Sequence, residues 1–214
     1  MTAPHAALEL QNIYLRAAQH VLFEDFSLRL ERDEIVTLMG PSGCGKSTLL
    51  AYLCGTLPAS IQARGSVRLG SRELTALPPE QRRLGILFQD DLLFPHLSVA
   101  DNLAFALSPR LRQRRERQAR IEAALQDAEL TGFGARDPAT LSGGQRARIA
   151  LLRTLLAEPE ALLLDEPFAK LDSATKTRFR DFVFEHARAR QLPTLLVTHD
   201  PADAIAAGGR VIEL

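Results

Sequence analysis

An apolar run leads directly into a glycine-rich loop at residues 35–48 of the 214-residue chain. These residues are Ile35-Val36-Thr37-Leu38-Met39-Gly40-Pro41-Ser42-Gly43-Cys44-Gly45-Lys46-Ser47-Thr48. The run at 35–39 is typical of a buried strand, and the stretch from Lys46 to Leu57 predicts a helix that ends near Gly55. A strand, a glycine-rich loop and a helix in this order are the context that a phosphate-binding loop requires.

The loop has the spacing G-x-x-x-x-G-K-[ST], which predicts binding of the ATP triphosphate. Small residues let main-chain N–H groups point at phosphate oxygens, and Lys46 adds a charge for the β and γ phosphates. The Ser47 hydroxyl suits Mg²⁺, and the N-terminus of the following helix attracts the same anion. The residues expected to bind are Gly40, Pro41, Ser42, Gly43, Cys44, Gly45, Lys46, Ser47 and Thr48. The alternative is an ordinary glycine-rich turn that precedes a helix.

Strand-like and helical stretches alternate along the rest of the chain and predict an α/β fold. The runs at 161–164 and 195–197 are apolar on both faces, as strands covered by helices on each side must be. β-rich stretches before residue 70 predict an antiparallel layer, and 90–157 predicts an inserted helical subdomain. We expect one domain over 1–214, in which 1–89 and 158–214 form the nucleotide-binding core with its β subdomain.

Composition excludes several partners and compartments. Lys+Arg and Asp+Glu are both 26, so no overall field attracts nucleic acid, and we expect no such partner. No apolar run reaches the roughly 18 residues that cross a bilayer, and residues 1–5 do not open a signal peptide. A helix between Cys44 and Cys54 would separate their ends by roughly 15 Å, which predicts free thiols. We therefore expect a cytoplasmic protein.

Two acidic residues, Asp165 and Glu166, follow the apolar run at 161–164. The carboxyl edge of a buried strand is where ligand sites form in α/β proteins. Asp165 there suits Mg²⁺ and Glu166 suits an attacking water. By itself the pair also fits a solvated turn, and the upstream loop favours the first interpretation.

The segment Leu141-Ser142-Gly143-Gly144-Gln145 is identical to the signature sequence of ABC-type ATPases. Gln89, the acid pair, Asp172 and His199 follow the order and spacing of that family, so the chain resembles an ABC ATPase over almost its whole length. The resemblance implies a P-loop NTPase fold with a RecA-like, mainly parallel sheet, an antiparallel β layer and an inserted α-helical subdomain that carries the signature.

The same resemblance assigns roles to the remaining residues. Gln89 would contact Mg²⁺ and the attacking water, Glu166 would be the base, and His199 would contact the γ phosphate. The signature would bind ATP held by a second copy of the protein, so two ATP molecules would lie in a head-to-tail dimer. The residues that act across this interface are Ser142, Gly143, Gly144, Gln145 and Asp172.

Two positions depart from the family pattern. Lys170 stands where the family usually has a small or uncharged residue, next to the predicted cross-dimer contact. Ala17 stands where the family commonly stacks an aromatic ring on adenine, and Tyr14 is a weak substitute. Because base stacking contributes roughly 1–3 kcal/mol, we expect poor discrimination between ATP and GTP.

Residues 92–102 resemble the stretch found in ATPases that drive bacterial importers. The resemblance implies an ATPase at the inner face of the plasma membrane that couples dimer closure to solute transport through permease subunits, with a separate solute-binding protein. Leu92, Phe94, Pro95 and Leu97 offer an apolar docking surface for the permease, or a loop packed on its own insert. Arginines between 110 and 120 could face lipid headgroups, although a solvated helix face also explains them. The competing functions are a soluble ABC ATPase with a non-transport partner and a P-loop kinase.

Overall fold

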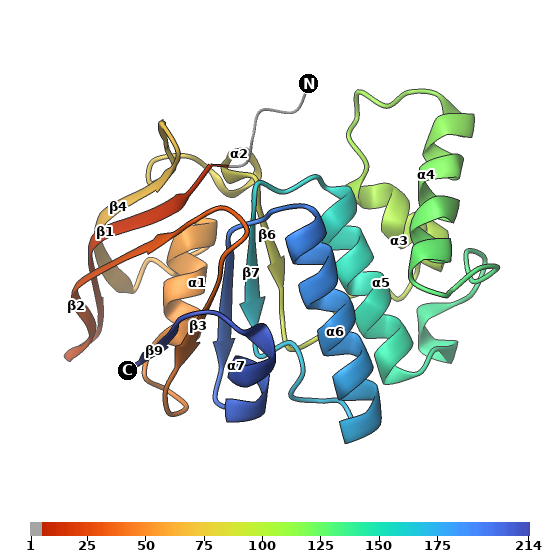
Figure 1. Ribbon diagram of the computed structural model, residues 1–214. Coiled ribbons are helices and arrows are strands. Elements are labelled where there is room, and N and C mark those ends of the chain that lie inside the picture. Colours follow the sequence, from red (N-terminus) through yellow and green to blue (C-terminus); the bar gives the residue numbers. More distant parts are fainter. Residues whose placement is uncertain (1–5) are drawn as a thin grey trace. The chain divides into compact units, whose positions relative to one another are not determined.

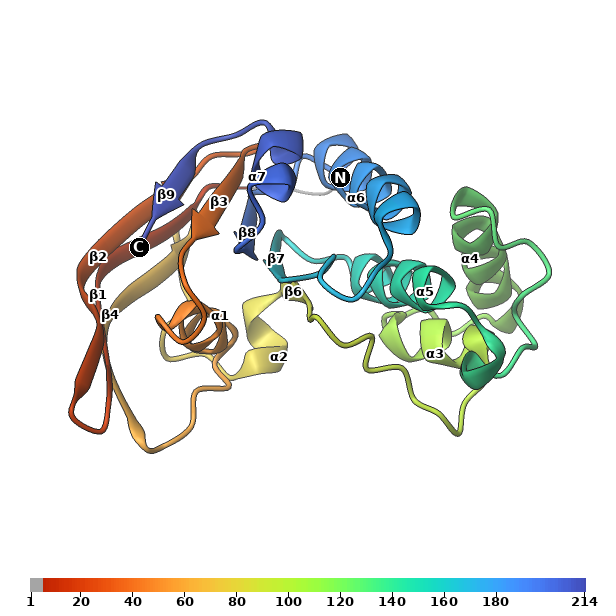
Figure 2. The same ribbon diagram turned by 90° about the horizontal axis from the view of Figure 1, so that it is seen from below.

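The computed structural model describes residues 6–214, so the expectation about a signal peptide at residues 1–5 lies outside the described part. The chain forms two compact units, which Figures 1 and 2 show from two sides. The first holds the described residues up to Ile86 together with Glu160–Glu166 and Phe184–Leu214. The second holds Leu87–Pro159 and Pro167–Val183.

An antiparallel sheet opens the first unit. It contains β1 (Leu8–Ala17), β2 (His20–Leu30), β4 (Ile61–Leu69) and β5 (Arg72–Glu73), in the order β2-β1-β4-β5. Alternating side chains of β1 are buried, as expected for a sheet with one face against a core. This is the predicted antiparallel layer.

The second sheet has the strand order β6-β7-β8-β3-β9. Its strands are β3 (Ile35–Met39), β6 (Leu84–Leu87), β7 (Ala161–Asp165), β8 (Thr194–Thr198) and β9 (Val211–Glu213). The pairings of β7 with β8, β8 with β3 and β3 with β9 are parallel. β8 is buried at every position, because a parallel strand in the middle of a sheet is covered on both faces. The predicted fold class is confirmed.

Helix α1 (Lys46–Cys54) lies between the two sheets (Figure 2). Its leucines share one apolar core with β1, β3 and β8. The helix ends at Cys54, three residues before the predicted Leu57, because Gly55 follows with a φ of 75°, the left-handed conformation that glycine tolerates best. Arg82, at the end of α2 (Pro79–Arg82), is buried and donates to the carbonyls of Tyr52 and Leu53 at 2.7 Å each. A cation therefore stabilises the negative end of the phosphate-loop helix.

The helices of the second unit are α3 (Val99–Ala106), α4 (Arg114–Asp127), the 3₁₀ turn η1 (Pro138–Thr140) and α5 (Gly143–Leu156). They share a core that includes Leu103, Leu125 and Ile149. Two further helices follow, α6 (Ser173–Ala189), which begins in the second unit and ends in the first, and α7 (Pro201–Ala207). None of the helices in residues 6–214 has the length and hydropathy of a membrane-spanning segment. Both cysteines are free, as predicted.

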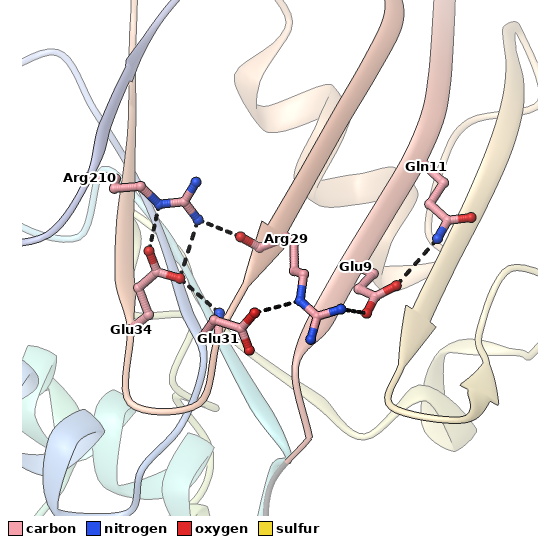
Figure 3. Close-up of polar contacts among 6 residues, drawn as sticks. All are labelled: Glu9, Gln11, Arg29, Glu31, Glu34 and Arg210. Carbon is pink, nitrogen blue, oxygen red and sulfur yellow. Dashed lines mark hydrogen bonds and ion pairs between the residues drawn. The ribbon is translucent and has the colours of Figure 1, made fainter.

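A polar network on the surface of the first unit joins the two sheets (Figure 3). Arg29 of β2 pairs with Glu9 of β1 at 2.6 Å and with Glu31. Glu34, just before β3, accepts from the main-chain N–H of Glu31 at 2.8 Å and from Arg210 Nε at 2.6 Å. Arg210 also donates to the main-chain carbonyl of Arg29. The network therefore fixes the entry of β3, whose other end carries the glycine-rich loop.

We expect Glu34→Gln to lower the free energy of unfolding by about 1 kcal/mol at pH 7. The hydrogen bond from Arg210 holds the pKa of Glu34 below its usual value, against the opposing effect of partial burial. A depressed pKa contributes stability above the unfolded-state pKa, and this is lost as pH falls through the folded-state pKa. The difference between variant and parent, measured by urea unfolding at pH 7, 5.5 and 4, should shrink on the acid side.

The matched control is Glu24→Gln, which removes an exposed carboxylate from β2. Its unfolding free energy should follow the parent at every pH. A Glu34→Gln difference that is unchanged at pH 4 would contradict the ion-pair explanation.

Candidate functional site

The glycine-rich loop connects β3 to α1 in a conformation that only glycine accommodates easily. Gly43 and Gly45 have φ values of 84° and 102°. A Cβ on Gly45 would also lie 3.0 Å from the Cβ of Leu22 and 3.1 Å from Cε2 of Phe23. Both the backbone angle and the close approach of β2 therefore require glycine at position 45.

Lys46, the first residue of α1, is folded back into the loop. Lys46 is 5% exposed, and its Nζ donates to the carbonyl oxygens of Gly40 at 2.7 Å and Pro41 at 2.8 Å. The ammonium group is thus held in place by the main chain of the loop itself. A phosphate in the loop would meet a positive charge that is already positioned.

Ser47 and Asp165, the two residues predicted to hold Mg²⁺ in the first unit, are in contact. The Ser47 hydroxyl donates to Oδ1 of Asp165 at 3.0 Å. Burial raises the pKa of Asp165, while the hydrogen bond from Ser47 and the charge of Lys46 act in the opposite direction. A hydroxyl and a carboxylate side by side provide the hard oxygen ligands that Mg²⁺ prefers, so these residues fit the ion.

Glu166 and His199 lie together at the ends of β7 and β8. His199 Nδ1 is 3.2 Å from Oε2 of Glu166. The Glu166 side chain is 21% exposed and the His199 side chain 56% exposed, so water reaches the pair. The main-chain N–H of Glu166 donates to the carbonyl of Val197 at 2.9 Å, and its φ is 46°. A carboxylate held in this way is suited to accept a proton from water, with the imidazole as its neighbour.

The signature segment begins α5 in the second unit. Ser142 and Gln145 form a capping box, in which Ser142 Oγ accepts from the Gln145 N–H at 3.3 Å and Gln145 Oε1 accepts from the Ser142 N–H at 3.0 Å. A Cβ on Gly144 would lie 2.4 Å from Cγ2 of Thr175. Asp172 Oδ1 accepts from the N–H of Thr175 at 3.1 Å, so it caps the start of α6. The signature therefore packs against the first turn of α6, which Asp172 caps.

Gln89 also belongs to the second unit, where it is exposed just after β6. The next residue, Asp90, pairs with Lys170, the residue that departs from the family pattern. The structure thus brings together Lys46, Ser47, Asp165, Glu166 and His199 in the first unit. Gln89, the signature and Asp172 belong to the second unit.

Ala17 ends β1 and pairs with His20 across the hairpin that leads into β2. Tyr14 is partly buried and lies opposite Arg64 of β4. The expected weakness in base discrimination stays a prediction.

Asn102 is a residue that the sequence analysis missed. It is fully buried in α3, where Phe94 N–H donates to its Oδ1 at 2.8 Å and its Nδ2 donates to the carbonyls of Phe94 and Leu97 at 3.1 and 3.2 Å. Arg153 of α5 donates to the carbonyl of Leu92 at 2.9 Å. These bonds give residues 92–97 a fixed shape. The sequence pattern that could have identified Asn102 is a polar amide side chain on the face of α3 that packs against the core.

The fold and the loop define a P-loop nucleotide-binding protein of the α/β class. Residues 23–169 match the ABC transporter family. The chain is 47% identical to the ABC transporter ATP-binding protein YnjD of Escherichia coli (strain K12), over 92% of this chain and 90% of YnjD. It is similar in fold to the dimeric bacterial ABC transporter cassette MJ0796, with a TM-score of 0.81, 29% identity and coverage of 97% of this chain and 94% of the other.

Relatives with named solutes align over less of their length. The chain is 40% identical to the Fe(3+) ions import ATP-binding protein FbpC 2 of Rhizobium meliloti (strain 1021), over 88% of this chain and 47% of FbpC 2. It is 39% identical to the spermidine/putrescine import ATP-binding protein PotA of Pseudomonas aeruginosa (strain UCBPP-PA14), over 99% of this chain and 57% of PotA. This chain therefore spans about half the length of these importer relatives. It belongs to the ABC transporter family, as an ATP-binding, ATP-hydrolysing subunit.

Proposed function

We propose that this protein couples ATP-driven closure of a homodimer to solute transport through separate permease subunits, as an importer-type ATPase. A solute-binding protein would deliver the solute, and the ATPase would work at the inner face of the membrane. The proposal is supported by importer relatives and by an exposed apolar surface on the second unit.

Within one subunit, the loop residues and Lys46 would bind the triphosphate. Ser47 and Asp165, with Gln89, would hold Mg²⁺, which when bound offsets the negative charge on the phosphates. Glu166 would accept the proton of the attacking water, and His199 would keep the carboxylate oriented through its 3.2 Å contact. The capped N-terminus of α5 supplies N–H groups for phosphate, and in the dimer these would serve the ATP of the second copy.

The observation that carries the transport role is an apolar surface, which we call the docking patch, formed by Leu92, Phe94 and Phe105. Leu92 is 56% exposed and Phe105 is 71% exposed. The rings of Phe94 and Phe105 meet edge to face, with centroids 4.9 Å apart, and the guanidinium of Arg153 lies 5.3 Å from the Phe94 ring centroid. Exposed aromatic rings that neighbouring side chains hold in place are typical of binding surfaces.

The patch also has a direct connection to the signature helix. Arg153 of α5 contacts Leu92 and Phe94, and Arg146 of the same helix pairs with Asp91 at 3.1 Å. A displacement of residues 91–94 by a partner would thus act on α5, which begins at the signature. This is the kind of two-sided contact that coupling between a permease and ATP turnover requires.

We expect Phe105→Asp to remove the permease partner while leaving ATP binding intact. Tagged protein, solubilised from membranes of its native cell, should co-purify with an integral membrane protein, because the patch buries aromatic surface against it. The variant places a charge on that surface and should lose the partner. The matched control is Ile205→Asp on α7, which changes another exposed apolar side chain, 80% exposed, in the first unit.

Recovery of a cytosolic protein or of RNA in place of a membrane protein would instead support the soluble ABC ATPase. Equal loss of the partner in Phe105→Asp and Ile205→Asp would remove the docking patch from the proposal.

A further inference from the structure

The position of His199 depends on its neighbours in the chain. Its side chain is 56% exposed, so packing does little to hold the ring against Glu166. The residues around it are different: Thr198 ends β8 with 2% exposure, and Asp203 of α7 is a carboxylate with 3% exposure. A buried carboxylate needs hydrogen-bond donors, because burial without them is costly.

The hydroxyl of Thr198, the residue before His199, is hydrogen-bonded to two residues that follow His199 in the chain. Thr198 Oγ1 donates to Oδ2 of Asp203 at 3.1 Å and accepts from the main-chain N–H of Asp200 at 3.0 Å. Asp200 in turn caps α7, since its Oδ1 accepts from the N–H of Ala202 at 2.8 Å. The main chain on both sides of His199 is thereby attached to buried groups.

The direction of these bonds follows from the chemistry of the groups. A hydroxyl has one proton to donate and lone pairs that accept. While Asp203 Oδ2 accepts the hydrogen bond from the Thr198 hydroxyl, a lone pair of the same Thr198 oxygen is directed at the N–H of Asp200. Without Asp203 the hydroxyl can rotate and give its proton to another acceptor, and the turn at 198–200 loses its fixed geometry.

The other side of the catalytic pair is already fixed by main-chain contacts. The N–H of Glu166 donates to the carbonyl of Val197, the residue before Thr198, and Asp165 is in register with Val197 between β7 and β8. The turn after Thr198 then helps to determine where the imidazole lies. The bond between Thr198 and Asp203 acts at this turn.

We propose that Asp203 is a positioning residue for ATP hydrolysis, which acts through Thr198 to hold His199 against Glu166. The inference rests on the proposed roles of Glu166 and His199. Asp203 does not touch the reacting atoms. Its contribution is the fixed geometry of the turn, and a misplacement of about 1 Å at a catalytic group costs up to about a hundredfold in rate.

The experiment removes the bond from each side. Thr198→Val removes the hydroxyl and Asp203→Leu removes the acceptor, and each should lower kcat by about tenfold to a hundredfold. KM for ATP should not change, because the phosphate loop is untouched. The double variant should lose no more than Thr198→Val alone, since Thr198→Val already removes the bond to Asp203. Thr198→Ser and Asp203→Asn keep a hydroxyl and an acceptor, and should restore most of kcat.

Thr75 offers a matched control in the antiparallel layer. Its hydroxyl likewise accepts from a main-chain N–H, that of Val67 at 2.8 Å, and donates to a carboxylate, that of Glu73. Thr75→Val removes the same pattern of bonds away from the ATP site and should keep the parent kcat. Rates are expressed per protein that binds ATP, so that unfolded protein does not count.

His199→Ala and Glu166→Gln separate the inference from the proposed function. If both are slow while Thr198→Val and Asp203→Leu turn over like the parent, the role of Asp203 is overturned and the catalytic pair stands. If His199→Ala turns over like the parent, the proposed role of His199 fails. A kcat in Asp203→Asn as low as in Asp203→Leu would also overturn the inference. Should Asp203→Leu not fold, the comparison of Thr198→Val with Thr198→Ser decides the outcome.

Discussion

We expect Glu166→Gln to retain ATP binding and to lose hydrolysis, by about a hundredfold to ten-thousandfold in kcat. The amide has the shape of the carboxylate but cannot accept a proton from water. Lys46 and the loop carbonyls that hold it are not in contact with the substituted atoms, so the dissociation constant for ATP should stay within about threefold of the parent. Because ATP then remains bound, the protein should accumulate as an ATP-bound dimer.

Gel filtration with ATP and with ADP measures this accumulation, and phosphate release measures hydrolysis. Glu160→Gln is the matched control, because Glu160 lies just before β7 and Glu166 just after it. Glu160 pairs with Arg72 and Arg83, and its loss should cost some stability but no turnover. A Glu166→Gln protein that stays monomeric with ATP, or hydrolyses ATP at the parent rate, would count against a site shared by two copies.

The strands and helices around this site could be predicted where the pattern lay within the element itself. β3 is apolar except for Thr37, a pattern that identifies a buried parallel strand, and the structure places it at Ile35–Met39. Helix α1 ends at Cys54, before Gly55, because glycine tolerates the left-handed conformation there. Asp165 and Glu166 lie at the carboxyl end of β7, where the apolar run of the sequence ends. Family resemblance assigned their roles, which stay predictions.

Several contacts between residues far apart in the sequence could not be predicted. Arg82 approaches the end of α1 from 27 positions after Gly55, and a Cβ on that glycine would lie 2.6 Å from its Nε. The left-handed backbone of Glu166 has no sequence signal, because glutamate has no preference for positive φ. Thr198 and Asp203 are only five positions apart in the sequence. Their hydrogen bond nevertheless depends on the direction that the chain takes between β8 and α7.

The arginines between 110 and 120 illustrate the same limit. Arg117 donates to the carbonyl of Ala104 at 2.7 Å, and Arg120 pairs with Glu116 and Glu158. These side chains therefore stabilise the second unit in part. A count of charges cannot distinguish an arginine that holds its own helix from one that faces a lipid or a partner.

Lys46→Ala and Ser142→Arg should separate the two halves of the ATP site. Lys46 would contact ATP in its own subunit, and truncation of a buried charge partner costs at least about 2 kcal/mol, or about thirtyfold in affinity. Ser142 would contact the ATP of the second copy. An arginine there removes the cap of α5 and fills the space in front of its N-terminus, so turnover should fall by about a hundredfold or more while ATP binding to the monomer is kept.

Binding of a fluorescent ATP analogue and phosphate release, measured on the same preparations, distinguish the two variants. Ser142→Ala loses the cap without the bulk, which should cost about 1 kcal/mol of stability, and it controls for damage to α5. Lys170→Ala removes an exposed lysine of the second unit and should bind the analogue like the parent. If Lys46→Ala and Ser142→Arg lose binding equally, both residues act on one ATP, and the division into a loop half and a signature half is wrong.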